Sequence, residues 1–181
     1  KVFTSSDHHF NKVKEFHSVM DESTQEEPIA WMPQDARYRA GFKLEELVEF
    51  LRAASNSEED FDSSVAYLHQ ALDKAADKVR SKSQAEVSLV GQVDALIDTL
   101  YFTYGSFVLM GVDPEQLFDI VHRANMGKIF PDGKAHFDPV THKILKPDDW
   151  EEKYAPEGAI KEELERQIQA YQRTLEQKEE N

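Results

Sequence analysis

Cysteine is absent from the 181-residue chain, so the protein has neither a disulfide framework nor a thiolate that could act as a nucleophile or metal ligand. Glycine and proline are scarce, at seven residues each, and they fall mostly between periodic segments. This pattern is typical of long helices joined by short turns. The lack of cysteine fits a reducing compartment, and we expect a cytoplasmic protein.

Basic residues are also in short supply, because 35 acidic residues face 21 Lys and Arg, for a formal net charge of −14. A field of this sign repels nucleic-acid backbones and anionic membranes, so neither is an expected partner. A small polyphosphate remains a feasible ligand where divalent cations neutralise the contact. No stretch has the pattern of a signal peptide or a membrane span, since Asp94 and Asp98 interrupt the most apolar segment.

Hydrophobic residues recur at helical spacing through most of the chain, which predicts an all-α fold. Capping residues are expected at Ser6 or Asp7, at Ser57 and at Asp113, and Gly111 is placed to end a helix. The helices should cover residues 7–20, 34–54, 58–82, 84–110, 114–126 and 156–179. Gly41 marks a possible break in the second of them.

Turn residues dominate two segments between these helices. Residues 22–33 are polar and hold two prolines, so we expect a loop there. Residues 129–150 predict a short irregular or hairpin segment. The simplest organisation is one α-helical domain at residues 1–155, with residues 156–181 as its C-terminal helical arm.

Two groups of carboxylates interrupt helices that otherwise look apolar. Glu49 follows Glu46 and Glu45 by three and four positions, so the three share a helix face. Asp94 and Asp98 are one turn apart on the most apolar helix. Each of these groups, if ionised and buried without a partner, would cost on the order of several kcal/mol.

A divalent cation would relieve this cost, and Mg²⁺ prefers carboxylate oxygens. Basic neighbours are the other remedy, and only Lys43 and Arg52 flank the first group. A solvated helix face remains the commoner explanation of the three glutamates. The two aspartates are harder to explain in that way, because they lie within an apolar helix.

Together these groups resemble the all-α nucleoside triphosphate pyrophosphohydrolases, which include MazG-like proteins, phosphoribosyl-ATP pyrophosphohydrolases and dimeric dUTPases. That superfamily carries an EExxE cluster on one helix and an acid pair, commonly ExxD, on a later one. Glu45-Glu46-x-x-Glu49 matches the cluster, and Asp98 followed by Thr-Leu-Tyr resembles the later aspartate. Ala95 stands where ExxD has its glutamate, so Asp94 would have to serve instead. The similarity continues through residues 16–17, 111–114, 121–128 and up to Pro147.

The resemblance implies a helical bundle of the MazG-like type that hydrolyses a nucleoside triphosphate to the monophosphate and pyrophosphate. It implies Mg²⁺, with Mn²⁺ as a substitute, held by Glu46, Glu49, Asp94 and Asp98. Glu45 would bind a further ion or orient the attacking water, so the catalytic residues would be Glu45, Glu46 and Glu49. House-cleaning of nucleotide pools is the role that analogy suggests.

Asn125 and Lys128 lie three residues apart near the end of a helix and therefore share a face. The resemblance implies that Asn125 contacts the base or sugar and that Lys128 contacts phosphate. An ordinary helix end with a solvated lysine is the alternative. Arg39 either reaches phosphate or pairs with an acid such as Glu45.

Four other polar residues are ambiguous. His17 is expected to be a satisfied core histidine, while His122 is close enough to Asn125 by helical spacing to line a pocket. Lys143 and Lys146 lie in the turn-rich segment, and the two alternatives for them are contact with a substrate over which the segment closes and simple solvation, the usual state of lysines in such segments.

Three questions stay open at this point. The residues do not select among phosphoribosyl-ATP, dUTP, dCTP and other nucleotides. A non-enzymatic helical interaction module with a structural or vestigial metal site is the rival interpretation. The apolar helices and the habit of the resembling family suggest a homodimer or a dimer of dimers.

Overall fold

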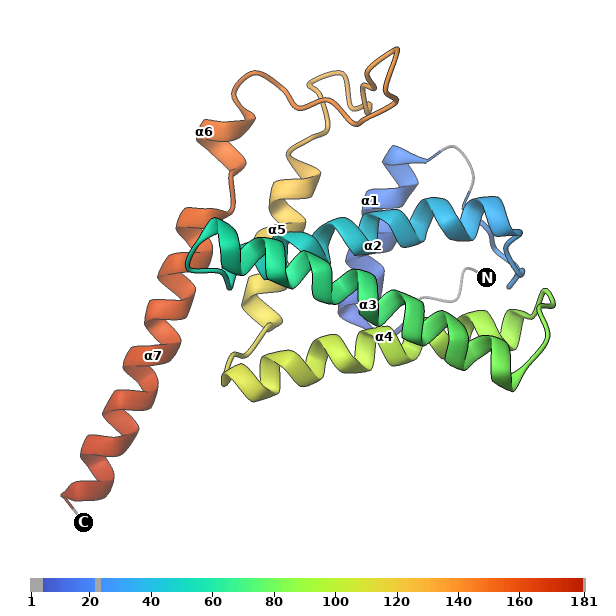
Figure 1. Ribbon diagram of the computed structural model, residues 1–181. Coiled ribbons are helices and arrows are strands. Elements are labelled where there is room, and N and C mark those ends of the chain that lie inside the picture. Colours follow the sequence, from blue (N-terminus) through green and yellow to red (C-terminus); the bar gives the residue numbers. More distant parts are fainter. Residues whose placement is uncertain (1–4, 22–23, 181) are drawn as a thin grey trace. The chain divides into compact units, whose positions relative to one another are not determined.

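The computed structural model describes residues 5–21 and 24–180, and in these ranges every regular element is an α-helix (Figure 1). The helices are α1 (His8–Met20), α2 (Pro33–Ala53), α3 (Glu58–Lys82), α4 (Leu89–Met110), α5 (Glu115–Met126), α6 (Trp150–Tyr154) and α7 (Glu157–Glu179). The all-α prediction is therefore confirmed.

The helices belong to two compact units, and α4 runs through both. One unit combines the residues up to Glu26 with those from Asp98 onward, and the other comprises Glu27–Ile97. Helix α7, which covers most of the expected C-terminal arm at residues 156–181, lies in the same compact unit as α6.

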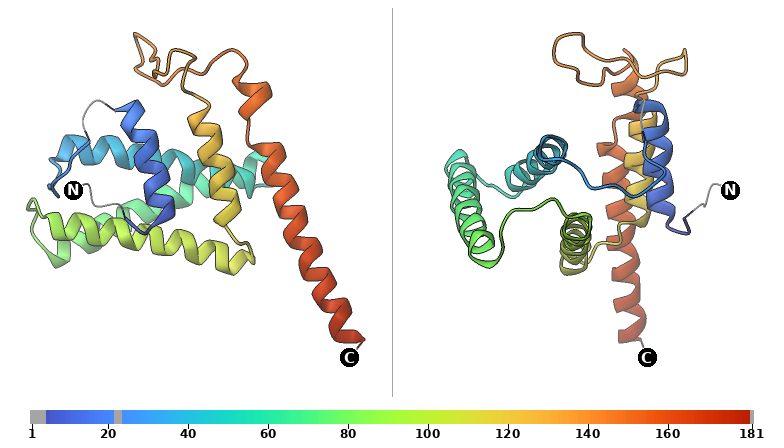
Figure 2. Two further views of the ribbon diagram at one scale, coloured as in Figure 1. Left: turned by 180° about the vertical axis from the view of Figure 1, so that it is seen from behind. Right: turned by 90° about the vertical axis from the view of Figure 1, so that its right-hand side faces the viewer.

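In the first unit α5 lies between α1 and α7 (Figure 2). Helix α1 is joined to α5 by an ion pair between Lys12 and Asp119. The rings of His9 and Phe118 stack with centroids 4.2 Å apart and add a second contact between the same helices. These contacts fix α5 as the centre of this unit.

The few buried hydrophobic side chains of the described residues also lie in this unit, and they are Met20, Ala124 and Trp150. The indole Nε1 of Trp150 donates a 2.8 Å hydrogen bond to the carbonyl oxygen of Ala124. This bond satisfies a carbonyl in the last turn of α5, where intrahelical partners run out. It ties the short helix α6 to the end of α5.

Gly127, just after α5, comes very close to α6. A Cβ atom at this position would lie 2.4 Å from Cγ of Tyr154, which is shorter than any normal contact. The sequence predicts an irregular or hairpin segment at residues 129–150 and no further helix before residue 156, so it misses α6. A helix of five residues is too short to show a hydrophobic period.

In the second unit α2 packs against α3. Arg52 at the end of α2 donates to both carboxylate oxygens of Glu58 in the first turn of α3, at 2.9 and 2.5 Å. The side-chain amide of Gln92 donates to the carbonyl of Trp31 at 2.9 Å and accepts from its N–H at 2.8 Å. No described residue between Glu27 and Ile97 is fully buried.

Helix ends follow the expected capping chemistry in most places. Asp7 accepts from the N–H of Phe10, and Ser57 accepts from the N–H of Asp60, as the sequence predicted. Gly111 takes a positive φ of 71° directly after α4, in agreement with its expected role. The possible break at Gly41 does not occur, because α2 continues through it.

Helix α4 begins at Leu89, five residues later than the expected start at Gln84. The reason lies at Ser88, whose hydroxyl oxygen accepts from the N–H of Gly91 at 3.0 Å. A serine that bonds to an amide three residues ahead acts as the cap, so the helix starts after it. In the 22–33 loop, residues 24–32 are free of helix as predicted, whereas Glu22 and Ser23 lie outside the described residues.

The segment between α5 and α6 is irregular, and its hairpin is reduced to one antiparallel bridge between Phe137 and Ile144. Two backbone bonds flank this bridge, from Leu145 N to His136 O at 2.7 Å and from Asp138 N to Lys143 O at 2.8 Å. The chain therefore folds back on itself here without forming a strand.

Most of the large apolar side chains of α4 are exposed, as are those of α2. Leu109 is 90% exposed and Val90 is 80% exposed. None of the helices in the described ranges combines the length and apolarity that crossing a membrane requires.

Candidate functional site

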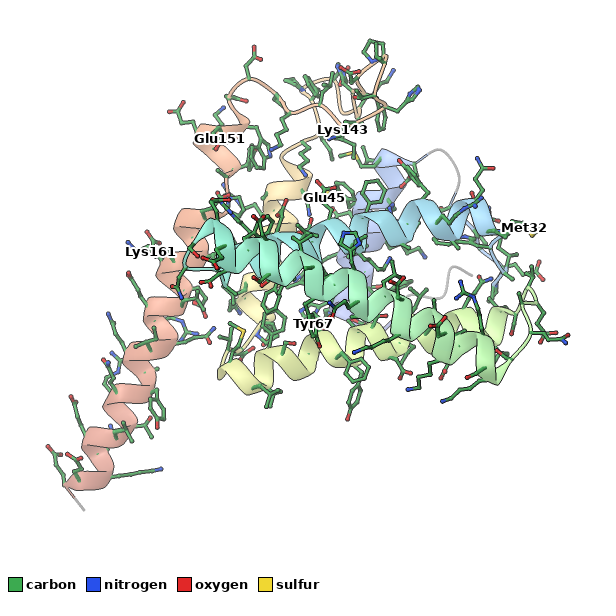
Figure 3. All side chains as sticks on the ribbon, viewed as in Figure 1. Met32, Glu45, Tyr67, Lys143, Glu151 and Lys161 are labelled. Atoms are coloured by element: carbon green, nitrogen blue, oxygen red, sulfur yellow. The ribbon has the colours of Figure 1, made fainter. Side chains whose placement is uncertain are left out.

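The predicted metal ligands lie on α2 and α4. Glu45, Glu46 and Glu49 project from successive turns of α2, and Glu45 is labelled in Figure 3. Asp94 and Asp98 are one turn apart on α4. All five carboxylates are exposed, and none has a hydrogen-bond or ion-pair partner among the described residues.

The structure does not by itself gather these acids into a metal centre. In the part of the chain that it describes, no group of three or more His, Asp or Glu side chains is placed to hold one ion. Glu45, Glu46, Glu49 and Asp94 belong to the Glu27–Ile97 unit, whereas Asp98 begins the second segment of the other unit. The donor chemistry suits Mg²⁺, since all the candidates are carboxylates.

Arg39 lies six residues before Glu45 on α2, and its guanidinium carbon is 5.4 Å from the centroid of the Phe42 ring. The expected alternative, an ion pair with Glu45, does not occur among the described residues. Burial lowers the pKa of the Lys43 ammonium, and the charge of Arg39 lowers it further. Two cations therefore lie directly beside the EExxE glutamates.

Asn125 and Lys128 are brought together as the helical spacing predicted. The Lys128 ammonium donates a 2.9 Å hydrogen bond to the Oδ1 atom of Asn125, and both side chains are half-buried. This bond orients the amide, because it assigns the oxygen to the lysine and leaves the NH₂ group pointing elsewhere.

Asn125 also lines a cavity of about 260 Å³ between α1 and α5. The walls are mainly apolar, and its lining consists of Val13, Phe16, His17, Phe118, Val121, His122 and Asn125. Apolar walls with a few polar groups are typical of sites for small organic ligands. Two phenyl rings and one amide offer a surface for a planar heterocycle.

Both histidines of this cavity have acidic partners. His17 pairs with Asp21 one turn later, and the Nε2 atom of His122 lies 3.3 Å from a carboxylate oxygen of Glu15. His122 thus lines the pocket as expected, while His17, predicted to be a core histidine, lines it too. The i,i+4 spacing of His17 and Asp21 was the sequence signal for that pair.

A second cationic group joins Lys128 at the end of α5. The Lys146 ammonium lies 4.1 Å from the centroid of the Trp150 ring system, and that of Lys128 lies 6.0 Å from it. Sequence reasoning could not separate Lys146 from Lys143, because both lie in the same turn-rich segment. Figure 3 shows Lys143 on that segment, and among the described residues the cation–π contacts with Trp150 come from Lys128 and Lys146.

The helical fold and the paired acids on α2 and α4 define the class of protein: it belongs with the all-α NTP pyrophosphohydrolases. A family model described as phosphoribosyl-ATP pyrophosphohydrolase matches residues 13–125, and the chain is a member of that family. The match includes Glu45, Asp98 and Asn125 but ends before Lys128.

One solved structure is closely similar. It is a protein from Exiguobacterium sp. 255-15, provisionally named as an NTP pyrophosphohydrolase and solved at 1.78 Å resolution. The TM-score is 0.83 and the sequences are 35% identical, over 92% of this chain and 99% of that one. The comparison with curated proteins found no match.

Proposed function

We propose that the protein hydrolyses a nucleoside triphosphate, or a related nucleotide, to the monophosphate and pyrophosphate in a Mg²⁺-dependent reaction. The observation that carries this proposal is the set of five carboxylates on α2 and α4 that lack any protein partner among the described residues. In a member of this pyrophosphohydrolase family, exposed carboxylates without protein partners on these two helices are available as cation ligands.

The proposed ligands are Glu46, Glu49, Asp94 and Asp98, and Mn²⁺ would be an acceptable substitute for Mg²⁺. When bound, the ion offsets phosphate charge and lowers the pKa of water. The Glu45 carboxylate accepts the proton of the water that attacks the α-phosphorus, whose bond to the pyrophosphate oxygen then breaks.

The rest of the substrate would lie along α5. The cavity that Asn125 lines suits the base or sugar, and Lys128 suits a phosphate oxygen. Arg39 provides a further phosphate contact from α2. A role in removing unwanted nucleotides from the cellular pool is consistent with this chemistry.

We also propose that the working form is a homodimer or a dimer of dimers. The exposed apolar side chains of α4 support this, because an apolar surface of that extent marks an interaction site. A second copy is the occupant we favour, since α4 of that copy offers a matching apolar surface and two-fold pairing is self-complementary.

The experiment that tests the activity is pyrophosphate release from a panel of nucleoside triphosphates and phosphoribosyl-ATP, with and without Mg²⁺. We expect metal-dependent turnover that falls by at least about a hundredfold in Glu49→Gln and in Asp98→Asn. Glu58→Gln is the matched control, because Glu58 pairs with Arg52 instead. Folded protein with no turnover on any nucleotide would favour the rival interpretation, a helical interaction module with a structural or vestigial metal site.

A further inference from the structure

The strongest feature outside the acid clusters is a pair of lysines at one aromatic ring. Trp150 is only 7% exposed, and its indole N–H is held by the carbonyl of Ala124. Its position is therefore fixed from the α5 side. Lys146 comes to this ring from the irregular segment, and Lys128 comes to it from the end of α5.

The close approach of Gly127 to Tyr154 holds the same ends together. Because a side chain at Gly127 would overlap the Tyr154 ring, α6 packs directly on the backbone that precedes Lys128. The guanidinium carbon of Arg123 lies 5.1 Å from the centroid of that same ring. Three cationic residues thus surround the α5–α6 junction of a chain whose net charge is −14.

A contact with an indole face attracts one cation, but two ammonium groups beside one ring repel each other. Acidic side chains of the segment would be the natural counter-ions for Lys146, yet three of its four, Asp132, Asp138 and Asp149, have other partners. Asp132 bonds to His136 at 2.7 Å, and Asp149 pairs with Lys153 at 2.6 Å. Asp138 accepts from the N–H groups of its own turn.

These acids remain ionised in those contacts. The hydrogen bond from His136 lowers the pKa of Asp132, and the hydrogen bond from Lys153 lowers the pKa of Asp149. Within residues 5–21 and 24–180, Lys146 forms no ion pair. Three of the four carboxylates of the segment are thus engaged elsewhere, and Lys146 is left to interact with a ligand that binds at Trp150.

We infer that Lys146 and Lys128 form a polyphosphate-binding site at Trp150, in which Lys146 binds the phosphoryl groups that leave as pyrophosphate. This inference rests on the proposed function for the direction of the substrate. Asn125 lines the cavity for the base, Lys128 bonds to Asn125, and Lys146 follows beyond it. A chain of phosphates running from α5 toward α6 would meet the two ammonium groups in turn.

The test measures binding of inorganic pyrophosphate to the intact protein, followed by tryptophan fluorescence. The chain has two tryptophans, so Trp31→Phe leaves Trp150 as the reporter. Trp31 bonds to Gln92 through its backbone, which the phenylalanine variant keeps. Pyrophosphate is titrated in the presence and absence of Mg²⁺, and inorganic phosphate is titrated in the same way for comparison.

In this background we expect Lys146→Met to weaken pyrophosphate binding about tenfold or more, while the apolar stem continues to cover the indole. Lys146→Arg should restore most of the affinity. Lys143→Met is the matched control, because Lys143 lies on the same segment but forms no cation–π contact with Trp150 among the described residues, and this variant should bind as the parent does. Pyrophosphate should bind more tightly than phosphate.

Equal affinities for Lys146→Met and Lys143→Met would overturn the inference, as would a Trp150 signal that ignores pyrophosphate. The outcome is separate from that of the hydrolysis panel. Pyrophosphate binding that depends on Lys146, in a protein that hydrolyses no nucleotide, would keep this site and reject the enzyme. If the parent protein hydrolyses a nucleotide but Lys146→Met binds pyrophosphate normally, the enzyme proposal is kept and the Lys146 site is rejected.

Discussion

Helices α4 and α5 follow one another in the chain but differ in how their apolar residues are distributed and buried. Helix α5 is strongly amphipathic and packs between α1 and α7, with Ala124 only 4% exposed. Helix α4 is far more apolar, yet none of its residues is fully buried. Leu109, near its C-terminal end, is 90% exposed.

The difference shows that apolar composition alone does not produce burial. A stripe of apolar residues, as on α5, is matched by helices of the same chain. A helix that is apolar on most of its circumference needs partners on several sides, and this chain supplies few of them to α4. This difference in burial between α4 and α5 is the basis of the dimer proposal, and substitutions on α4 and at the end of α5 can test it.

The largest effect should come from placing a charge on α4. Leu109→Glu should weaken self-association about tenfold to a hundredfold, because burying one leucine contributes about 1.5–3 kcal/mol. Light scattering after size-exclusion chromatography measures this directly. Leu109→Met keeps the volume and should associate normally. A parent protein that is monomeric at micromolar concentration would contradict the proposal.

A smaller effect is expected from Gly127→Ala at the end of α5. Gly127 has ordinary helical dihedral angles, so any loss of stability comes from the contact with Tyr154. We expect a loss of about 1–3 kcal/mol in urea unfolding. Gly41→Ala on α2, with nothing within 4 Å of the new Cβ, should instead gain about 0.5–1 kcal/mol. Similar values for the two variants would refute the close packing at α6.

The smallest effect concerns the link between α4 and α5. Gln167 of α7 holds both backbone groups of Asp113 at 2.9 Å, and Glu163 accepts from Gln167 at 3.1 Å. Hydrogen bonds from Arg166 and Gln167 lower the pKa of Glu163 from 4.5 to about 2. The stabilisation is therefore present above pH 4.5 and is lost as the pH falls toward 2.

Thermal unfolding between pH 5 and pH 3 measures this contribution. We expect the melting temperature of Glu163→Gln to fall less over this range than that of the parent protein. Glu162→Gln, which alters an exposed neighbour, should follow the parent. An identical pH dependence for the parent and Glu163→Gln would show that the Gln167 contact does not depend on the carboxylate.

Local signals predicted most of the helices, because capping and periodicity act within a few residues. Asp7 and Ser57 cap their helices through their own side chains, and Gly111 ends α4 with a positive φ. The start of α4 was wrong because Ser88, and not the earlier helix-compatible residues, provides the cap. Helix α6 was missed because Trp150 is held by a tertiary bond to Ala124.

The candidate site divides in the same way. The bond between Asn125 and Lys128 follows from a spacing of three on one helix. The contact of Lys146 with Trp150 depends on how an irregular segment folds back, which no periodicity encodes. Convergence of Glu46, Glu49, Asp94 and Asp98 is a tertiary or quaternary property, and it stays a prediction.

The amide of Gln92 imitates a peptide group when it clasps both polar atoms of Trp31. The N–H and the carbonyl of Trp31, just before α2, are thus both hydrogen-bonded, as they would be beside a neighbouring β-strand. The linker that follows α1 is therefore anchored at Trp31, which Gln92 of α4 holds two residues before the start of α2 at Pro33. Because Trp31 is anchored, insertions or deletions near residues 24–28 should leave the position of the glutamates on α2 unchanged.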